Sequence, residues 1–161
     1  MRGPIVVGAD GSENSRLAIE GAAAIAKGSG QSVVVTYVRH VPLAGLSAGW
    51  TGSLSVGALH ETLCTSESLA EAQSIAILDA AGADWRFVVR VGDPANELMR
   101  LATEVGAETI VVAGRRHGAL GAMACASVCT QLLHRWPRSV MVIHPHSEKA
   151  DATAKTVPGE Q

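Results

Sequence analysis

Short apolar runs alternate with longer stretches of helical spacing along most of this chain. Runs rich in β-branched residues predict five strands, at residues 5–9, 32–38, 85–91, 109–113 and 139–143. Between them, apolar residues at helical spacing predict helices that end near residue 27 and that span about 58–81, 94–105 and 124–134. Strands and helices joined by short connections form parallel βαβ units. The pattern therefore predicts an open, twisted α/β sheet of five strands, with helices on both faces.

Capping residues mark where two of these helices begin. Asp10-Gly11 is followed by Ser12 and Ser15, either of which can cap the first helix, and Asp93-Pro94 offers an N-cap with proline at the first helical position. The same turn chemistry leaves Asp10 with two interpretations. Its carboxylate either stabilises the turn or contacts a ligand, since aspartate before Gly-Ser is common in turns.

Three turns of the predicted sheet are expected to meet at one edge. Ligands of open α/β sheets lie beyond the carboxyl ends of the strands, where the strand order reverses, and the first and fourth strands are expected to be neighbours there. This arrangement places the turn at Asp10, the residues after Val38 and the loop that starts at Gly114 together.

The loop from Gly114 to Gly121 contains three glycines together with Arg115 and Arg116. Glycines let backbone N–H groups approach a phosphate, and the following helix start and the arginines favour an anion. The alternative is a turn that needs glycine only for its geometry, with both arginines solvated.

Two segments lack periodicity. Residues 39–56 contain Pro42, several glycines and Trp50, and such a long loop either covers a site or is disordered at the surface. Residues 147–161 are polar and are interpreted as a disordered tail, so that residues 1–146 form the one expected domain.

Composition and charge indicate what the core consists of and which classes of partner are not expected. Aromatic residues make up only 3% of the chain against 47% hydrophobic residues, so the core must consist mostly of aliphatic side chains. A net charge of −2 does not favour binding to nucleic acid. No apolar run approaches the roughly 20 residues of a membrane span and no signal peptide is recognised, so a cytoplasmic protein without a membrane partner is expected.

The three cysteines, Cys64, Cys125 and Cys129, show no disulfide framework and fit reduced thiols. Cys125 and Cys129 share a helix face and are interpreted as small buried residues. His144-Pro145-His146 has no matching ligand pattern, and no metal site is expected.

Several segments now combine into a known pattern. Ile5–Ser12, Gly92–Ala95 and Ile110–Gly118 follow in order, and Ser127-Val128 and Val140–Ile143 close the series. In this order and spacing they resemble the universal stress protein family, over residues 4–144. The resemblance implies a small, cytoplasmic, Rossmann-like protein of the adenine nucleotide alpha hydrolase-like fold. It also implies a homodimer linked to survival under stress and often lacking catalytic activity.

In members of the family that bind ATP with Mg²⁺, the resemblance places adenine at Asp10 and at a backbone group near Val38. The phosphates lie on a motif of glycine, two residues, glycine, nine residues, then glycine and serine. The cofactor-binding residues so implied are Ala9, Asp10, Val38, Gly114, Arg116, Gly118, Ser127 and Val128.

This chain departs from that motif. His117 stands where the second glycine is expected, with Gly118 next to it, and Ala126 replaces the last glycine. Eleven residues separate Gly114 from Ala126, one fewer than in the motif. An alanine methyl group can obstruct a phosphate, and Ser127 can equally be a helix serine that bonds back to the preceding turn.

Three classes of function follow. The chain is either an adenine-nucleotide-binding regulatory protein, or a dimeric stress protein that binds no nucleotide and acts through partners, or an enzyme. The enzyme class is disfavoured because the chain lacks Gly-x-Ser-x-Gly and the Gly-Lys-Ser/Thr of a P-loop, and no base for ATP hydrolysis is identified. The last strand is expected at a sheet edge, where pairing with a second copy would satisfy its backbone.

Overall fold

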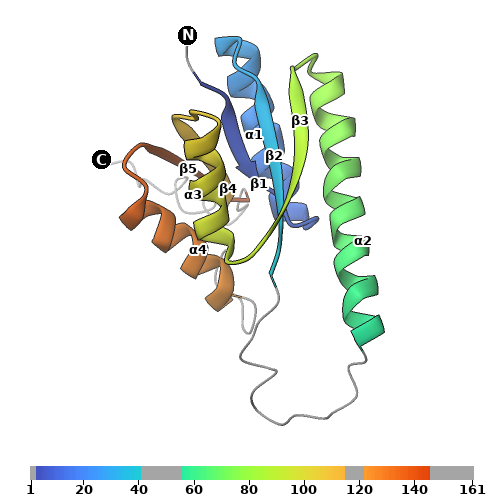
Figure 1. Ribbon diagram of the computed structural model, residues 1–161. Coiled ribbons are helices and arrows are strands. Elements are labelled where there is room, and N and C mark those ends of the chain that lie inside the picture. The colour runs from blue at the N-terminus through green and yellow to red at the C-terminus, as the bar shows by residue number, and fades with distance from the viewer. Residues whose placement is uncertain (1–2, 41–55, 115–121, 146–161) are drawn as a thin grey trace, which may run out of the picture.

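The computed structural model describes residues 3–40, 56–114 and 122–145 (Figure 1). In chain order the elements are β1 (Ile5–Gly8), α1 (Glu13–Ser29), β2 (Val33–Arg39), α2 (Val56–Ser74), η2 (Ile75–Asp79), β3 (Trp85–Val91), α3 (Pro94–Glu104), β4 (Thr109–Ala113), α4 (Ala122–Arg135) and β5 (Ser139–Ile143). The predicted loop at 39–56, including Trp50, lies almost wholly outside the described residues, as does the predicted tail at 147–161.

The five strands form one parallel sheet in the order β3-β2-β1-β4-β5. β1 lies between β2 and β4, so that Val6 is in register with Val34 on one side and with Ile110 on the other. The predicted α/β fold is confirmed, and so is the pairing of the first and fourth strands. Because the chain turns back across β1 to reach β4, the strand order reverses between these two strands.

Each face of the sheet carries its own hydrophobic core, because successive side chains of a strand point to opposite faces. Val7 packs with Ile19 of α1 and Leu78 of η2 in one cluster. Val6 packs with Leu98 of α3 and Leu132 of α4 in the other cluster. The helices therefore cover both faces, with α3 and α4 on the face that carries the pocket described below.

Local capping follows the sequence closely. Ser12 is the N-cap of α1, where its hydroxyl accepts a hydrogen bond from the Ser15 N–H at 3.2 Å. Asp93 is the N-cap of α3, where its carboxylate accepts from the Asn96 N–H at 3.0 Å, and Pro94 begins the helix. Of the two predicted caps for the first helix, the structure uses Ser12.

The long helical stretch predicted at 58–81 is present, and α2 continues without a break into a final turn of different geometry. α2 ends at Ser74, and the five residues of η2 form a π-helix turn. Within it, Leu78 is fully buried, and the following Asp79 accepts a hydrogen bond from the Trp85 indole N–H at 2.7 Å. Apolar spacing does not distinguish a π turn from an α-helix, because both keep one face toward the core.

The remaining bounds differ little from the prediction. Three strands, at 85–91, 109–113 and 139–143, have their predicted bounds, and β1 and β2 end one residue away from them. Both β3 and β5 are edge strands, so the expected edge position of the last strand is confirmed.

Candidate functional site

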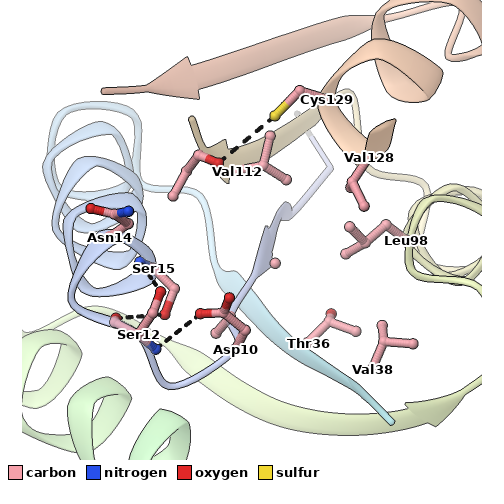
Figure 2. A pocket seen from close by; sticks show the side chains of 13 residues that line it. Asp10, Ser12, Asn14, Ser15, Thr36, Val38, Leu98, Val112, Val128 and Cys129 are labelled. Atoms are coloured by element: carbon pink, nitrogen blue, oxygen red, sulfur yellow. Dashed lines mark hydrogen bonds between the residues drawn. The ribbon is translucent and has the colours of Figure 1, made fainter. Parts of the chain in front are cut away.

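A pocket opens at the carboxyl ends of β1, β2 and β4, where the core under α3 and α4 ends (Figure 2). Its volume is about 110 Å³. It is lined by Gly8, Ala9, Asp10, Ser12, Asn14, Ser15, Thr36, Val38, Leu98, Val112, Ala113, Val128 and Cys129. These residues come from three strands, the turn after β1 and three helices, at the point where the strand order reverses.

The pocket has two chemically different sides. Figure 2 shows Asp10, Ser12 and Ser15 together on one side, with Leu98 and Val38 across from them. Val112 and Val128 continue the apolar lining. A flat ring with polar atoms at its edge suits such a site, because apolar walls hold its faces while a few polar groups fix its orientation.

The polar side is built by the turn that joins β1 to α1. The Asp10 carboxylate accepts a hydrogen bond from the Ser12 N–H at 2.9 Å, and the Ser15 hydroxyl donates to the Ser12 carbonyl at 2.9 Å. Gly11 between them has a φ of 78°, in the left-handed region that favours glycine. The Asp10 side chain thus stabilises the turn, and because Asp10 is exposed it also faces the pocket mouth. The two predicted roles of Asp10 are therefore compatible.

The apolar side depends on a glycine in β1. A Cβ atom at Gly8 would lie 3.2 Å from Cδ1 of Leu98 and 3.3 Å from Cγ1 of Val112. Both distances are tighter than ordinary van der Waals contact. The missing side chain at Gly8 therefore contributes to the space between the sheet and α3.

Cys129 of α4 lines the same pocket. It is partly buried, and its thiol donates to the Ala113 carbonyl at a sulfur–oxygen distance of 3.7 Å. The sequence predicted a small buried residue here, whereas the structure places the thiol in the wall of a pocket. The side chain of Cys125 is outside the described residues, and Cys64 of α2 is exposed.

The predicted glycine loop is described only at its first residue. Gly114 is buried, and its N–H donates to the Ile143 carbonyl of β5 at 2.8 Å. Gly114 follows the pocket-lining Ala113 but does not itself line the pocket. Its N–H is therefore engaged within the fold.

Of the eight residues proposed from the sequence, Ala9, Asp10, Val38 and Val128 line one pocket. Arg116 and Gly118 are outside the described residues, and Ser127 lies in α4 with its side chain outside them. Sequence reasoning missed Thr36 and Leu98. Strand alternation could have found Thr36, since it lies two positions before Val38 and therefore on the same face of β2.

On the face of the sheet opposite the pocket, charged and aromatic side chains join β2 to α2. Arg39, at the end of β2, binds the Glu67 carboxylate of α2 through two hydrogen bonds of 2.7 and 3.0 Å. Beside it, burial raises the pKa of Tyr37, an effect that a hydrogen bond with Ser66 partly opposes. These contacts fasten β2 to α2 on the face opposite the pocket.

Metal ions and membranes are two further possible partners of the described residues. Among them, no three His, Cys, Asp or Glu side chains are grouped closely enough to hold a metal ion. None of the described helices combines the length and the apolar character that a membrane span requires.

Comparison with known proteins decides the family. A model described as the universal stress protein family matches residues 1–144. The chain belongs to the universal stress protein family. No curated protein matches the chain in a sequence search.

Solved universal stress protein structures share the fold. A universal stress protein from Archaeoglobus fulgidus superposes with a TM-score of 0.66 at 23% identity, over 89% of this chain and 99% of its own. A universal stress protein in complex with cAMP gives a TM-score of 0.67 at 23% identity, over 91% and 100%. The Archaeoglobus fulgidus protein in complex with dAMP gives 0.61 at 22% identity, over 87% and 96%.

Proposed function

We propose that this universal stress protein binds an adenine nucleotide, with the base in the pocket between Asp10 and Leu98, and acts as a nucleotide-responsive regulator of the stress response. The observation that carries the proposal is the pocket itself. It lies at the reversal of strand order and combines an apolar side with a polar turn. Two proteins of the same fold are described in complex with cAMP and with dAMP, which supports an adenine ring as the occupant.

The size of the pocket limits which part of the ligand it holds. Sites for whole drug-sized ligands measure roughly 300–1,000 Å³, whereas this pocket measures about 110 Å³. The base alone is therefore the part assigned to it. Asp10 is proposed to accept a hydrogen bond from the amino group of adenine, because a carboxylate offers only acceptors.

The ribose and phosphates are proposed to extend from the base toward the end of β4 and the start of α4. There Gly114, Arg116, Gly118, Ser127 and Val128 remain the proposed residues on the phosphate side, with ATP and Mg²⁺ as the proposed form of the ligand. Gly114 would serve by having no side chain, since its N–H is already bonded to Ile143. Bound ATP would place its triphosphate, together with the Mg²⁺ ion, near the end of β4 and the start of α4. The proposal is one of binding, and no catalytic residue is assigned.

A cytoplasmic homodimer is proposed as the assembly. The edge strand β5 leaves one side of its backbone unpaired within the sheet, and its Met141 is 41% exposed. Pairing with β5 of a second copy would cover both. Cys64 and Cys129 are in the thiol form, which fits a reducing compartment.

A second candidate function is a dimeric stress protein that holds no nucleotide and acts through partners. The bond from Gly114 to Ile143 favours it, because it removes one backbone donor from the predicted phosphate loop. The altered spacing between Gly114 and Ala126 favours it as well.

The two candidates are separated by native mass spectrometry of freshly purified protein, followed by calorimetric titration with AMP, cAMP, and ATP with and without Mg²⁺. The first candidate predicts a co-purifying adenine nucleotide or a measurable affinity for at least one of these ligands. Absence of both, together with no shift in melting temperature on adding Mg-ATP, would leave the second candidate.

The position of the base is tested with two substitutions of one residue. Asp10→Ala removes the proposed acceptor and should abolish binding, although it also removes the bond to Ser12. Asp10→Asn is the matched control, because its amide oxygen can still accept from the Ser12 N–H while the charge is lost. Binding that survives both changes would show that the base lies elsewhere.

A further inference from the structure

One buried polar atom of a pocket-lining residue has no hydrogen-bond partner among the described residues. Thr36 is 1% exposed, and its hydroxyl oxygen is unpartnered within the described part of the chain. Three other buried side-chain atoms there share this state, on Gln73, Arg90 and Trp136. Thr36 differs from them because it lines the pocket at the carboxyl ends of the strands.

The position of Thr36 is fixed by the sheet. Thr36 is in register with Gly8 of β1, and its carbonyl accepts a hydrogen bond from the Ala9 N–H at 2.9 Å. Figure 2 shows Thr36 beside Val38 and below Leu98, across the pocket from Asp10. The hydroxyl is therefore held by rigid backbone on the apolar side of the pocket.

A buried hydroxyl without a partner lowers stability, since it has lost its bonds to water and gained none. Valine has nearly the same shape and would fill this position without that loss. A group that is unfavourable for the empty protein is a candidate for a role in the occupied one, because functional sites retain such residues.

We propose that the Thr36 hydroxyl is the polar contact that recognises the edge of the base in this pocket. The inference rests on the proposed function and adds a determinant of specificity to it. A hydroxyl both donates and accepts, so it can pair with a ring nitrogen or with an amino group. A carbocyclic ring would leave the hydroxyl unpaired and would bind more weakly.

Thr36 and Asp10 together define the chemical class of the ligand. The carboxylate of Asp10 only accepts hydrogen bonds, so it requires an N–H group on its side of the ring. The hydroxyl of Thr36 takes the other polar edge. A 6-aminopurine carries both features, whereas a 6-oxopurine presents an oxygen at the position of that amino group, where it would repel the carboxylate.

The experiment is calorimetric titration of the full-length protein with AMP, using two variants of one residue. Thr36→Val keeps the shape and removes the hydroxyl, and it should weaken AMP binding about tenfold, the ratio expected for losing one buried hydrogen bond. Thr36→Ser keeps the hydroxyl and should bind within about threefold of the wild type. In the absence of ligand, Thr36→Val should melt at the wild-type temperature or above it.

A series of ligands tests the same contact without changing the protein. The 1-deaza, 3-deaza and 7-deaza analogues of AMP each replace one ring nitrogen by a C–H group, and purine riboside monophosphate lacks the amino group. One of these four analogues should bind the wild type about tenfold more weakly than AMP binds the wild type. The same analogue should bind Thr36→Val at least as tightly as AMP binds Thr36→Val, because the contact is already lost in that variant. Inosine monophosphate should bind the wild type more weakly than AMP.

The outcomes separate this inference from the proposed function. If the wild type binds AMP and Thr36→Val binds it equally well, the role of Thr36 is wrong and the nucleotide site stands. If Thr36→Val melts well below the wild type while its affinity is unchanged, the hydroxyl is structural and the inference fails. If the wild type binds none of the nucleotides, the proposed function fails and the inference fails with it.

Discussion

The imidazole ring of His144 occupies the space where a side chain on Gly114 would stand. A Cβ built on Gly114 would overlap the Cε1, Nδ1 and Nε2 atoms of that ring. His144 directly follows β5, and Gly114 directly follows β4, to which β5 is paired. The absence of a side chain at Gly114 therefore lets the residue after β5 fold over the end of β4, beside the pocket.

This contact predicts the effect of Gly114→Ala. The added methyl group should displace the ring of His144, which is exposed and can move aside, and should lower the free energy of unfolding by about 1 kcal/mol, the low end of what overpacking costs. Denaturant unfolding measures the change. The double substitution Gly114→Ala with His144→Ala should recover most of the loss, because it removes the ring that the methyl group meets. Equal losses in the single and double variants would place the strain elsewhere.

The N-cap of α3 predicts a second loss of stability. Asp93→Ala removes the acceptor for the Asn96 N–H and should lower the free energy of unfolding by about 1 kcal/mol. Asp93→Asn is the control, since asparagine caps a helix about as well and should stay close to the wild type. Both variants should keep the wild-type affinity for AMP, because Asp93 does not line the pocket. An Asp93→Ala variant as stable as the wild type would contradict the capping role.

Tyr37 predicts how stability depends on alkaline pH. Burial raises its pKa above the ordinary value of 10.0, the Ser66 hydrogen bond opposes this, Glu67 and Asp10 raise it further, and Arg39 opposes it. The folded state therefore favours the neutral phenol. The stabilising contribution is complete below pH 10 and is lost as the pH rises through the folded-state pKa.

The measurement is denaturant unfolding of the wild type and Tyr37→Phe across alkaline pH. The wild type should lose more stability above pH 10 than Tyr37→Phe, since phenylalanine cannot ionise. Tyr37 is the single tyrosine of the chain, so the ultraviolet absorbance of tyrosinate follows this group alone. Parallel pH profiles for both proteins would contradict the prediction.

The reactivity of the Cys129 thiol tests whether a ligand lies in the pocket. Its thiol lines the pocket, while Cys64 is exposed on α2 outside the pocket. Bound AMP should therefore slow alkylation of Cys129 by N-ethylmaleimide and leave Cys64 unaffected, as read by mass spectrometry of the digested protein. Cys64 serves as the internal control. Equal protection of both thiols, or of neither at saturating AMP, would place the ligand outside this pocket.

Local sequence signals predicted the elements because their causes are local. Ser12 and Asp93 cap their helices through bonds to residues three positions away, and a β-branched run such as Thr109–Ala113 is buried wherever it enters a sheet. The order of strands followed from these elements, since short βαβ connections leave few arrangements. The π turn at Ile75–Asp79 escaped prediction, because the spacing of apolar residues does not distinguish a π turn from an α-helix.

Only part of the candidate site was predicted, because local signals mark the ends of strands but not the contacts between distant elements. Asp10 was found because it follows the end of the first strand, which the sequence marks, and Val38 was implied by the resemblance to the family. Thr36 and Cys129 were missed as pocket residues, since their relation to the pocket depends on how β2 and α4 lie against β1.

By itself, the sequence determined the fold class, the helix caps and the edge of the sheet at which the pocket lies, because hydrophobic period and turn chemistry act over a few residues. Only the tertiary structure decided that the Thr36 hydroxyl has no partner among the described residues while Thr36 lines a pocket, that Cys129 forms part of the pocket wall and that His144 covers Gly114. Those contacts join residues far apart in the chain, and the close packing of side chains that sets them leaves no periodic trace in the sequence.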